Sequence, residues 1–207
     1  MKGNDNNLES IKISCLGDSS VGKTYLTRKY IQDINLDSTL PTIGIEYLTT
    51  QKVLSNGKNY KIYIYDTVGQ EKYKSLSLNS IRHCDGVILM YDITNRKTFD
   101  SISEWIKNIY EKKDEDYPLV LIGNKCDLED ERIISKEEGL EKAEKYKTIY
   151  IETSAKEGIN VGKAIEELLD KIIKKKEENK DKEKNGNNIK LDASKNIHKN
   201  RRKCCGK

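Results

Sequence analysis

The residues with the clearest capacity for chemistry lie in one glycine-bounded run, Gly17-Asp18-Ser19-Ser20-Val21-Gly22-Lys23-Thr24. The two glycines let the backbone curl until successive N–H groups point at one anion. Lys23 can then reach the β- and γ-phosphates of a nucleotide as a point charge, and the Thr24 hydroxyl can ligate the Mg²⁺ that bridges them. The run therefore predicts a phosphate-binding loop. The competing interpretation is a plain Gly-Ser connection between two elements.

The segments on either side of this loop support the first interpretation. The alternating apolar residues from Ile11 to Leu16 predict a strand before the loop, and the run from Tyr25 to Ile31 predicts a helix after it, ending near Asp33. A helix N-terminus carries the positive end of the helix dipole, which favours a bound phosphate. Strand, loop and helix together are the context in which G-x-x-x-x-G-K-[ST] indicates phosphate binding.

A second candidate site follows a predicted hairpin. Two strand-like runs, Ile45 to Leu54 and Tyr60 to Tyr65, are separated by Asn56-Gly57, which is a strong hairpin signal. The second run leads into Asp66-Thr67-Val68-Gly69-Gln70-Glu71. An acidic residue such as Asp66 at a strand end can hold Mg²⁺, and a glycine beside it can offer its backbone N–H to a terminal phosphate.

The rest of the chain alternates between predicted strands and helices. Buried strands are predicted at 84–92, 119–123 and 148–152, and helices at 98–112, 136–147 and from 161 to about 174. The last two strands lead into Asn124-Lys125-Cys126-Asp127 and Thr153-Ser154-Ala155-Lys156. This alternation predicts a doubly wound α/β fold with a mostly parallel six-stranded sheet, in which ligands bind at the carboxyl ends of the strands. We expect Trp105 to be a packing residue.

Composition limits the remaining possibilities. A chain of 207 residues suits one domain and an appendage, and no run approaches the length of about 20 apolar residues that a membrane-spanning helix needs. The first residues lack the apolar core of a signal peptide, so we expect a cytosolic protein. Three of the five cysteines are isolated and without metal-ligand spacing, and two are adjacent near the end, which argues against a disulfide framework.

The net charge of +4 conceals two opposite parts. Residues 174–207 contain 13 Lys and Arg against 5 Asp and Glu, a net charge of +8, which leaves 25 against 29, a net charge of −4, for residues 1–173. Residues 176–203 have few apolar positions and cannot order themselves by burial, so we expect a disordered C-terminal tail. A solvated extension of the last helix is the alternative for its first turns. The basic tail suits an anionic membrane surface; nucleic-acid binding is not expected, because the folded part offers no basic face.

Four motifs together resemble the nucleotide-binding motifs of the Ras superfamily of small GTPases: 17–24, 66–69, 124–127 and 154–156. The resemblance covers roughly residues 9–175. It implies a P-loop NTPase G-domain over residues 9–175, between a flexible N-terminus at 1–8 and a basic hypervariable tail at 176–207. The implied activity is hydrolysis of GTP to GDP and phosphate.

The resemblance also implies the ligands and the site. GTP or GDP is expected to bind with Mg²⁺, and the metal ligands are expected to be Thr24, Thr42 and Asp66. Gln70 is expected to orient the attacking water as the catalytic residue. The nucleotide-binding residues are expected to be Ser19, Ser20, Val21, Gly22, Lys23, Thr24, Thr42, Gly69, Asn124, Lys125, Asp127, Ser154, Ala155 and Lys156.

The base-binding roles follow from chemistry and from the family. A carboxylate such as Asp127 can accept hydrogen bonds from N1–H and the exocyclic amine of guanine, a donor pair that adenine lacks. The resemblance implies that Asn124 supports the loop, that the stem of Lys125 lies over the purine, and that the Ala155 N–H meets the guanine O6.

Within the superfamily the chain resembles the Rab branch, through residues 43–47, 61–67, 71–76 and 84–92. The terminal Cys204-Cys205-Gly206-Lys207 resembles the dicysteine ends that carry two geranylgeranyl groups; it also fits a C-a-a-X box with Cys204 as acceptor, although Lys207 is an unusual last residue. The resemblance implies a monomeric GTP/GDP switch of vesicle traffic on the cytoplasmic face of an intracellular membrane, cycling with the cytosol. Its implied partners are an exchange factor, a GTPase-activating protein, an escort protein, a GDP-dissociation inhibitor and GTP-dependent effectors.

The chain also departs from the family pattern. Asn35 stands where an aromatic residue usually stacks on the base, Val68 stands where alanine is usual, and Ser80 replaces an aromatic of the effector surface, whose other positions are Tyr47 and Tyr65. Asn35 and Val68 motivate a second hypothesis, a nucleotide-binding scaffold that hardly hydrolyses GTP. A third hypothesis is a small phosphotransferase, which would need an Arg-rich lid; residues 90–175 contain only Arg96 and Arg132.

Overall fold

A mixed six-stranded sheet forms the centre of the fold. The computed structural model describes residues 8–32, 45–67 and 78–200, with side chains as far as Asp181, those of Gln32 and Ile45 excepted. In these ranges the strand order is β2-β3-β1-β4-β5-β6, and only the β2–β3 pair is antiparallel. The strands are β1 (Glu9–Gly17), β2 (Ile45–Val53), β3 (Asn59–Thr67), β4 (Gly86–Asp92), β5 (Leu119–Asn124) and β6 (Ile149–Thr153). The predicted sheet is confirmed.

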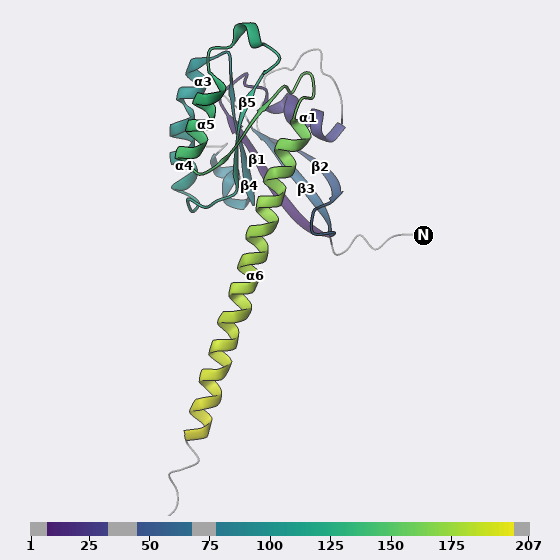
Figure 1. Cartoon of the computed structure of the whole chain (residues 1–207). Helices are drawn as coiled ribbons and strands as arrows, with labels where there is room; N and C mark the ends of the chain where they lie inside the picture. The colour runs from purple at the N-terminus through teal and green to yellow at the C-terminus, as the bar shows by residue number, and fades with distance from the viewer. Residues whose placement is uncertain (1–7, 33–44, 68–77, 201–207) are drawn as a thin grey trace, which may run out of the picture. The chain divides into compact units, whose positions relative to one another are not determined.

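Helices cover both faces of this sheet (Figure 1). The α-helices are α1 (Lys23–Gln32), α3 (Arg96–Asp100), α4 (Ile102–Tyr110), α5 (Lys136–Lys145) and α6 (Val161–Asn200), and the 3₁₀ helices are η2 (Ile81–His83) and η3 (Glu129–Glu131). The first part of α6, up to Ile172, lies on the side of α1, where Gly86 of β4 faces Leu168 and Ile172 at close range. Helices α3, α4 and α5 cover the opposite face.

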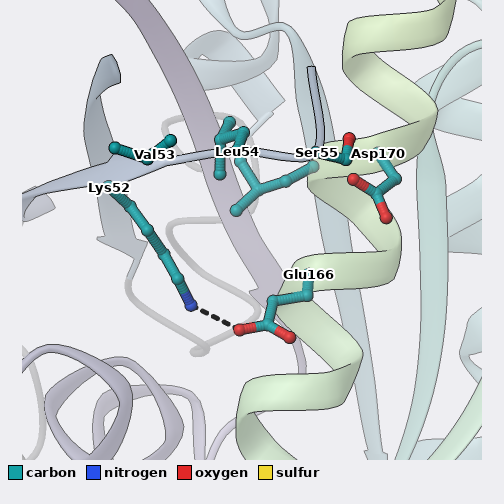
Figure 2. Close-up of a pocket in the computed structure, with 7 residues that line it drawn as sticks. Lys52, Val53, Leu54, Ser55, Glu166 and Asp170 are labelled. Carbon is teal, nitrogen blue, oxygen red and sulfur yellow. Dashed lines mark hydrogen bonds and ion pairs between the residues drawn. The ribbon is translucent and has the colours of Figure 1, made fainter. Parts of the chain in front are cut away.

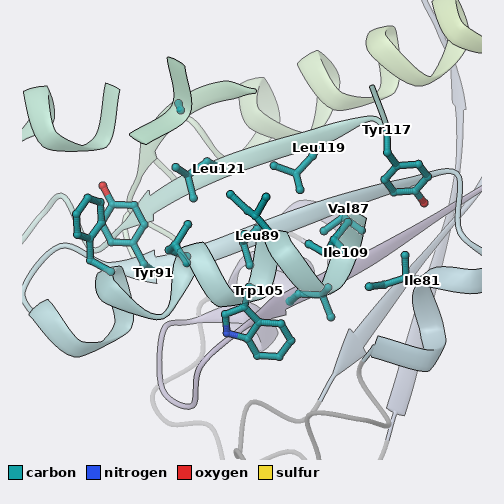
Figure 3. Packing of buried hydrophobic residues seen from close by; sticks show 14 of the residues in the cluster. Ile81, Val87, Leu89, Tyr91, Trp105, Ile109, Tyr117, Leu119 and Leu121 are labelled. Atoms are coloured by element: carbon teal, nitrogen blue, oxygen red, sulfur yellow. The ribbon is translucent and has the colours of Figure 1, made fainter. Parts of the chain in front are cut away.

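The buried cluster on the α4 face is built by alternation along the strands (Figure 3). Val87, Leu89 and Tyr91 of β4 point into it, and helix α4 contributes residues at helical spacing. Its fully or almost fully buried members include Leu16, Ile81, Ile93, Phe99, Ile102, Trp105, Ile106, Ile109, Leu119, Leu121 and Ala143. The predicted packing role of Trp105 is thereby confirmed, because only 2% of its surface is exposed.

The helix predicted at 98–112 is two helices. Helix α3 begins two residues earlier, because the Asn95 side chain caps it by accepting from the backbone N–H of Lys97. The division falls at Ser101, whose hydroxyl donates to the Lys97 carbonyl at 2.9 Å. The backbone N–H of Ser101 donates to the same carbonyl at 3.1 Å, and Ser101 keeps helical dihedral angles, so the two helices follow each other directly. A hydroxyl that shares the carbonyl four residues earlier bends a helix slightly, which agrees with a division at this residue.

Helix α6 continues beyond the end near 174 that apolar spacing predicts. The chain divides into two units, 1–172 and 173–207, and the helix belongs to both. No side chain between residues 174 and 181 is buried, which agrees with the expectation that this part of the chain gains nothing from burial. None of the helices in the described ranges is both long enough and apolar enough to cross a bilayer.

One cavity lies at the amino-terminal end of the parallel strands, where the β2–β3 hairpin meets helix α6 (Figure 2). Its volume is about 350 Å³, and it is lined by Lys52, Val53, Leu54, Ser55, Glu166, Leu169 and Asp170. Lys52 and Glu166 form an ion pair across it, which ties the edge strand β2 to α6. It lies at the opposite end of the sheet from the glycine-bounded loop.

Candidate nucleotide site

The carboxyl ends of the parallel strands carry the predicted site residues side by side. Gly17 ends β1, Asp92 ends β4, Asn124 ends β5 and Thr153 ends β6. Asp92 pairs with Asn124, and Asn124 pairs with Thr153, so the register places these three residues in a row across the sheet. Asp66, next to the end of β3, pairs with β1 two residues before Gly17. The ends of five parallel strands thus meet at one edge.

The loop after β1 requires both of its glycines. Gly17 has φ +138°, and a Cβ there would lie 2.3 Å from the Met90 carbonyl oxygen. Gly22 has φ +101°, and a Cβ there would lie 2.3 Å from Nδ2 of Asn124. Any other residue would be strained by its backbone and would also collide with its neighbour. The two positions therefore admit only glycine in this conformation.

Lys23 is buried at the centre of the loop, with 6% of its surface exposed. Its Nζ donates to the carbonyl oxygens of Gly17 at 3.0 Å and of Asp18 at 2.7 Å. Burial lowers the pKa of this amine, whereas the nearby Cys15 and Asp66 act in the opposite direction. The loop thus contains a cation enclosed by backbone, and a phosphate would provide it with a full counter-charge.

Thr24 and Asp66 join the loop to β3. The Thr24 hydroxyl donates to Oδ2 of Asp66 at 2.5 Å, and only 2% of the Asp66 surface is exposed. A hydroxyl and a carboxylate are the hard oxygen ligands that Mg²⁺ prefers. The two side chains predicted as metal ligands from separate motifs are therefore adjacent, and their chemistry fits the ion.

Asn124 connects three segments through one amide. Its Nδ2 donates to the Val21 carbonyl at 2.8 Å, and its Oδ1 accepts from the Thr153 hydroxyl at 2.9 Å and from the Ala155 N–H at 3.0 Å. The side chain is almost fully buried, with 2% exposed. It therefore holds the phosphate loop against the segments that follow β5 and β6.

The remaining predicted base-binding residues lie around Asn124. Lys125 adopts φ +70°, and its Nζ forms an ion pair with Asp92 at 2.6 Å. Asp127 is half-buried, Ser154 is fully buried with its hydroxyl accepting from the Glu157 N–H, and Lys156 is exposed. Asp92 was not among the predicted site residues, although its place at a strand end is the same signal that selected Asp66.

Other parts of the predicted site cannot be placed. Thr42, Gly69 and Gln70 lie outside the described residues, as do Asn35, Val68 and the terminal Cys204 and Cys205. The two arginines considered for a phosphotransferase lid are both bound to carboxylates. Arg96 pairs with Glu138, and Arg132 pairs with Glu129 and Glu152. This pairing disfavours a phosphate-binding lid.

Comparison with known proteins gives the family. The model of the Ras family matches residues 12–174. The chain is 40% identical over 164 residues to Ras-related protein Rab-10 of Diplobatis ommata, which covers 79% of this chain and 82% of that protein. It is 40% identical to Ras-related protein Rab-3C of Bos taurus, over 81% of this chain and 73% of that protein. It is 38% identical to Ras-related protein Rab-3A of Homo sapiens, over 82% of this chain and 77% of that protein.

The region that matches the family model includes the glycine-bounded loop, Asn124 and the segment at Ala155, which the hydrogen bonds of Asn124 hold together. It extends over most of the chain and agrees with relatives of about 40% identity. The chain therefore belongs to the Ras family and is a small GTPase of the Rab type.

Proposed function

We propose that this protein is a GTP/GDP switch of vesicle traffic that hydrolyses GTP slowly. The observation that carries the proposal is the Asn124 amide, which joins the phosphate loop at Val21 to the Ala155 segment. A nucleotide bound here would contact all three segments at once. Its presence or absence is then coupled to the order of the loops around it, which is the basis of a nucleotide switch.

The base is selected by Asp127 in this proposal. Its carboxylate accepts from N1–H and the exocyclic amine of guanine, and adenine would leave it without these donors. We expect GTP to displace a fluorescent GDP analogue from the full-length protein, and ATP to fail at a thousandfold excess. Asp127→Ala should abolish the preference for GTP over ATP. Asp130→Ala is the control, because it removes an exposed carboxylate three residues later, and it should retain the preference. Equal displacement by ATP and GTP would contradict the proposal.

Mg²⁺ would be held by Thr24 and Asp66, with Thr42 as the third side chain that the family implies. The ion supplies neutralisation of the phosphate charge. Thr24 and Asp66 are already in contact, so the hydroxyl and the carboxylate are close enough to hold one ion between them, the carboxylate directly or through a bound water. Chelation of Mg²⁺ should accelerate release of the bound nucleotide, and Thr24→Val should reduce this sensitivity.

Hydrolysis is assigned to Gln70, which orients the attacking water in this proposal. Residues 34–41 contain no arginine that could stabilise the transition state from within, so fast turnover should need one supplied by an activating protein. Rates without it are on the order of 10⁻⁴ to 10⁻² s⁻¹ in this mechanistic class. In single-turnover assays Gln70→Leu should suppress hydrolysis at unchanged GTP affinity, whereas Gln51→Leu on strand β2 should not.

The same assay separates the switch from the scaffold hypothesis. A scaffold would bind GTP tightly and show no hydrolysis even after addition of a Rab-directed activating protein. A switch that depends on its activator would show hydrolysis only after that addition.

Membrane attachment is proposed through Cys204 and Cys205. Two prenyl groups, or one group beside a basic segment, give stable anchoring, whereas one alone is marginal. The attached protein would act on the cytoplasmic face of an intracellular membrane and cycle with the cytosol through a GDP-dissociation inhibitor, after delivery by an escort protein. An exchange factor, an activating protein and GTP-dependent effectors complete the proposed partners. Mass spectrometry of the protein purified from its own cells would count the lipid groups.

A further inference from the structure

A tryptophan of the core contacts the phosphate loop. Nε1 of Trp105, on helix α4, donates to Oδ1 of Asp18 at 2.8 Å. The indole is packed in the buried cluster of Figure 3, and 2% of its surface is exposed. A donor held this firmly has little freedom to follow its acceptor, so the contact constrains Asp18 more than it constrains Trp105.

Asp18 occupies the point where the chain leaves β1 for the loop. The residue before it, Gly17, is confined by the Met90 carbonyl, and the carbonyl of Asp18 itself accepts from Nζ of Lys23 at 2.7 Å. The orientation of the first peptide group of the loop therefore depends on the Asp18 side chain and on Lys23. Lys23 is expected to turn toward phosphate when nucleotide binds, which leaves the side chain as the lasting anchor.

The other end of the loop has an anchor of the same kind. Asn124 donates to the Val21 carbonyl, so the loop is held from β5 at one end and from α4 at the other. Between these anchors lie only Ser19 and Ser20, both exposed, and Ser20 has φ +63°. A short segment with both ends held keeps its N–H groups converged without losing conformational freedom on binding.

We propose that Trp105 is a positioning residue for nucleotide binding, acting through Asp18 to hold the phosphate loop in its binding conformation. The inference rests on the proposed function, because it assigns Trp105 a role at that same site. It goes beyond the packing role, since a residue that only fills the core would affect folding and leave nucleotide release unchanged.

The test is a double-mutant cycle that measures the rate at which the full-length protein releases a bound fluorescent GDP analogue at saturating Mg²⁺. The analogue is excited directly, so its signal does not depend on Trp105. Trp105→Phe keeps most of the packing and removes the donor, and Asp18→Ala removes the acceptor. Each should accelerate release roughly tenfold, in the range of a hydrogen bond to a charged group. The double variant should release at about the rate of the faster single variant, because both changes remove the same contact.

Two controls separate positioning from packing. Asp18→Asn retains an acceptor oxygen and should release GDP within about threefold of wild type. Ile106→Val shortens a fully buried neighbour on the same helix, so it should lower the melting temperature without accelerating release. Trp105 is the only tryptophan of the chain, so tryptophan fluorescence in the Asp18→Ala and Asp18→Asn variants reports the surroundings of this one indole. The emission should shift in the first variant and stay near wild type in the second.

Two results would overturn the inference. Wild-type release rates in Trp105→Phe, or effects of the two substitutions that multiply to about a hundredfold, would show that the contact does not position the loop. In either case tight guanine-nucleotide binding by the wild type leaves the proposed function standing. Failure of the wild type to retain GDP would defeat the inference and the proposed function together.

Discussion

The amide of Asn124 makes more contacts between segments than any single group described above at the site, which makes it sensitive to truncation. Asn124→Ala removes three hydrogen bonds and leaves the Val21 carbonyl and the Ala155 N–H without this partner in a buried region. We expect the free energy of unfolding, measured by urea denaturation, to fall by about 2–4 kcal/mol. We also expect the fluorescent GDP analogue to dissociate faster.

The matched control is Asn108→Ala, whose side chain donates only to the Glu104 carbonyl of its own helix. It should change the free energy of unfolding by less than about 0.5 kcal/mol. Equal losses in the two variants would show that the Asn124 contacts contribute nothing beyond a local hydrogen bond.

At the residue scale, the sequence predicts which side chains gather better than it predicts their individual contacts. The types and spacing of Lys23, Thr24 and Asp66 predict a phosphate and metal site, and the structure brings these three side chains together. The contact between Trp105 and Asp18 joins residues 87 positions apart, and no local pattern marks it. Such a pair depends on how helix α4 is placed over the sheet, which a sequence periodicity does not specify.

Among the elements, helix α5 has an N-terminal cap whose contribution to stability depends on pH. Glu138 accepts from Arg96 and from the backbone N–H of Ser135, and these bonds lower the pKa of its carboxyl from 4.5 to about 2. A lowered carboxyl pKa stabilises the folded state above pH 4.5, and this contribution is lost as the pH falls toward about 2. Glu138→Gln should therefore be less stable than wild type at pH 6, and the difference should shrink below pH 4.5.

Urea denaturation at several pH values measures this difference. Glu137→Gln, which changes the exposed neighbour on the same helix, is the control and should show no comparable loss at pH 6. A difference between wild type and Glu138→Gln that stayed constant from pH 6 to pH 2 would contradict the cap's role.

The middle of the same helix should resist a substitution that normally stabilises. Replacing glycine by alanine in a helix gains up to about 1 kcal/mol. At Gly139, however, a Cβ would lie 2.3 Å from the Tyr150 ring and 2.7 Å from the Tyr91 hydroxyl. We expect Gly139→Ala to lower the free energy of unfolding by about 1–3 kcal/mol, through overpacking.

Gly162→Ala in helix α6 provides the contrast, because no atom lies within 4 Å of the added Cβ. It should raise stability slightly or leave it unchanged. If both variants gained stability, Tyr150 would have to move away at little cost, and its hydrogen bonds to Tyr91 and Glu152 would not fix its position.

Elements were predicted more accurately than their ends. Period and apolar content placed all the strands of the described sheet, because buried parallel strands are short apolar runs bounded by turn residues. The division at Ser101 was not predicted, since serine is compatible with a helix and its hydroxyl bond to the Lys97 carbonyl leaves no mark in the sequence pattern. The length of α6 was not predicted either, because burial, the signal used, ends before residue 174.

On the scale of the whole molecule, the basic tail at 174–207 and the mildly acidic remainder of the chain predict salt-sensitive membrane binding through the tail. The unlipidated full-length protein should bind vesicles that contain phosphatidylserine at low salt and dissociate at about 0.5 M salt, where screening is strong. Replacing Arg201, Arg202 and Lys203 by alanine should weaken binding roughly a hundredfold, at about 1 kcal/mol per charge.

The control replaces three exposed lysines of the folded part, Lys58, Lys107 and Lys112, and so changes the net charge equally. Similar losses in both triple variants would show that net charge alone, rather than the position of the basic residues, governs binding.

The proximity of Gly22 to Asn124 also limits how this sequence can evolve. A Cβ at position 22 would meet the Asn124 amide at 2.3 Å, and the same amide holds the Val21 carbonyl. A side chain at 22 would therefore become acceptable only after position 124 had become smaller, and that first step would release the loop. Each single change passes through a defective intermediate, so the two residues can be exchanged only as a pair.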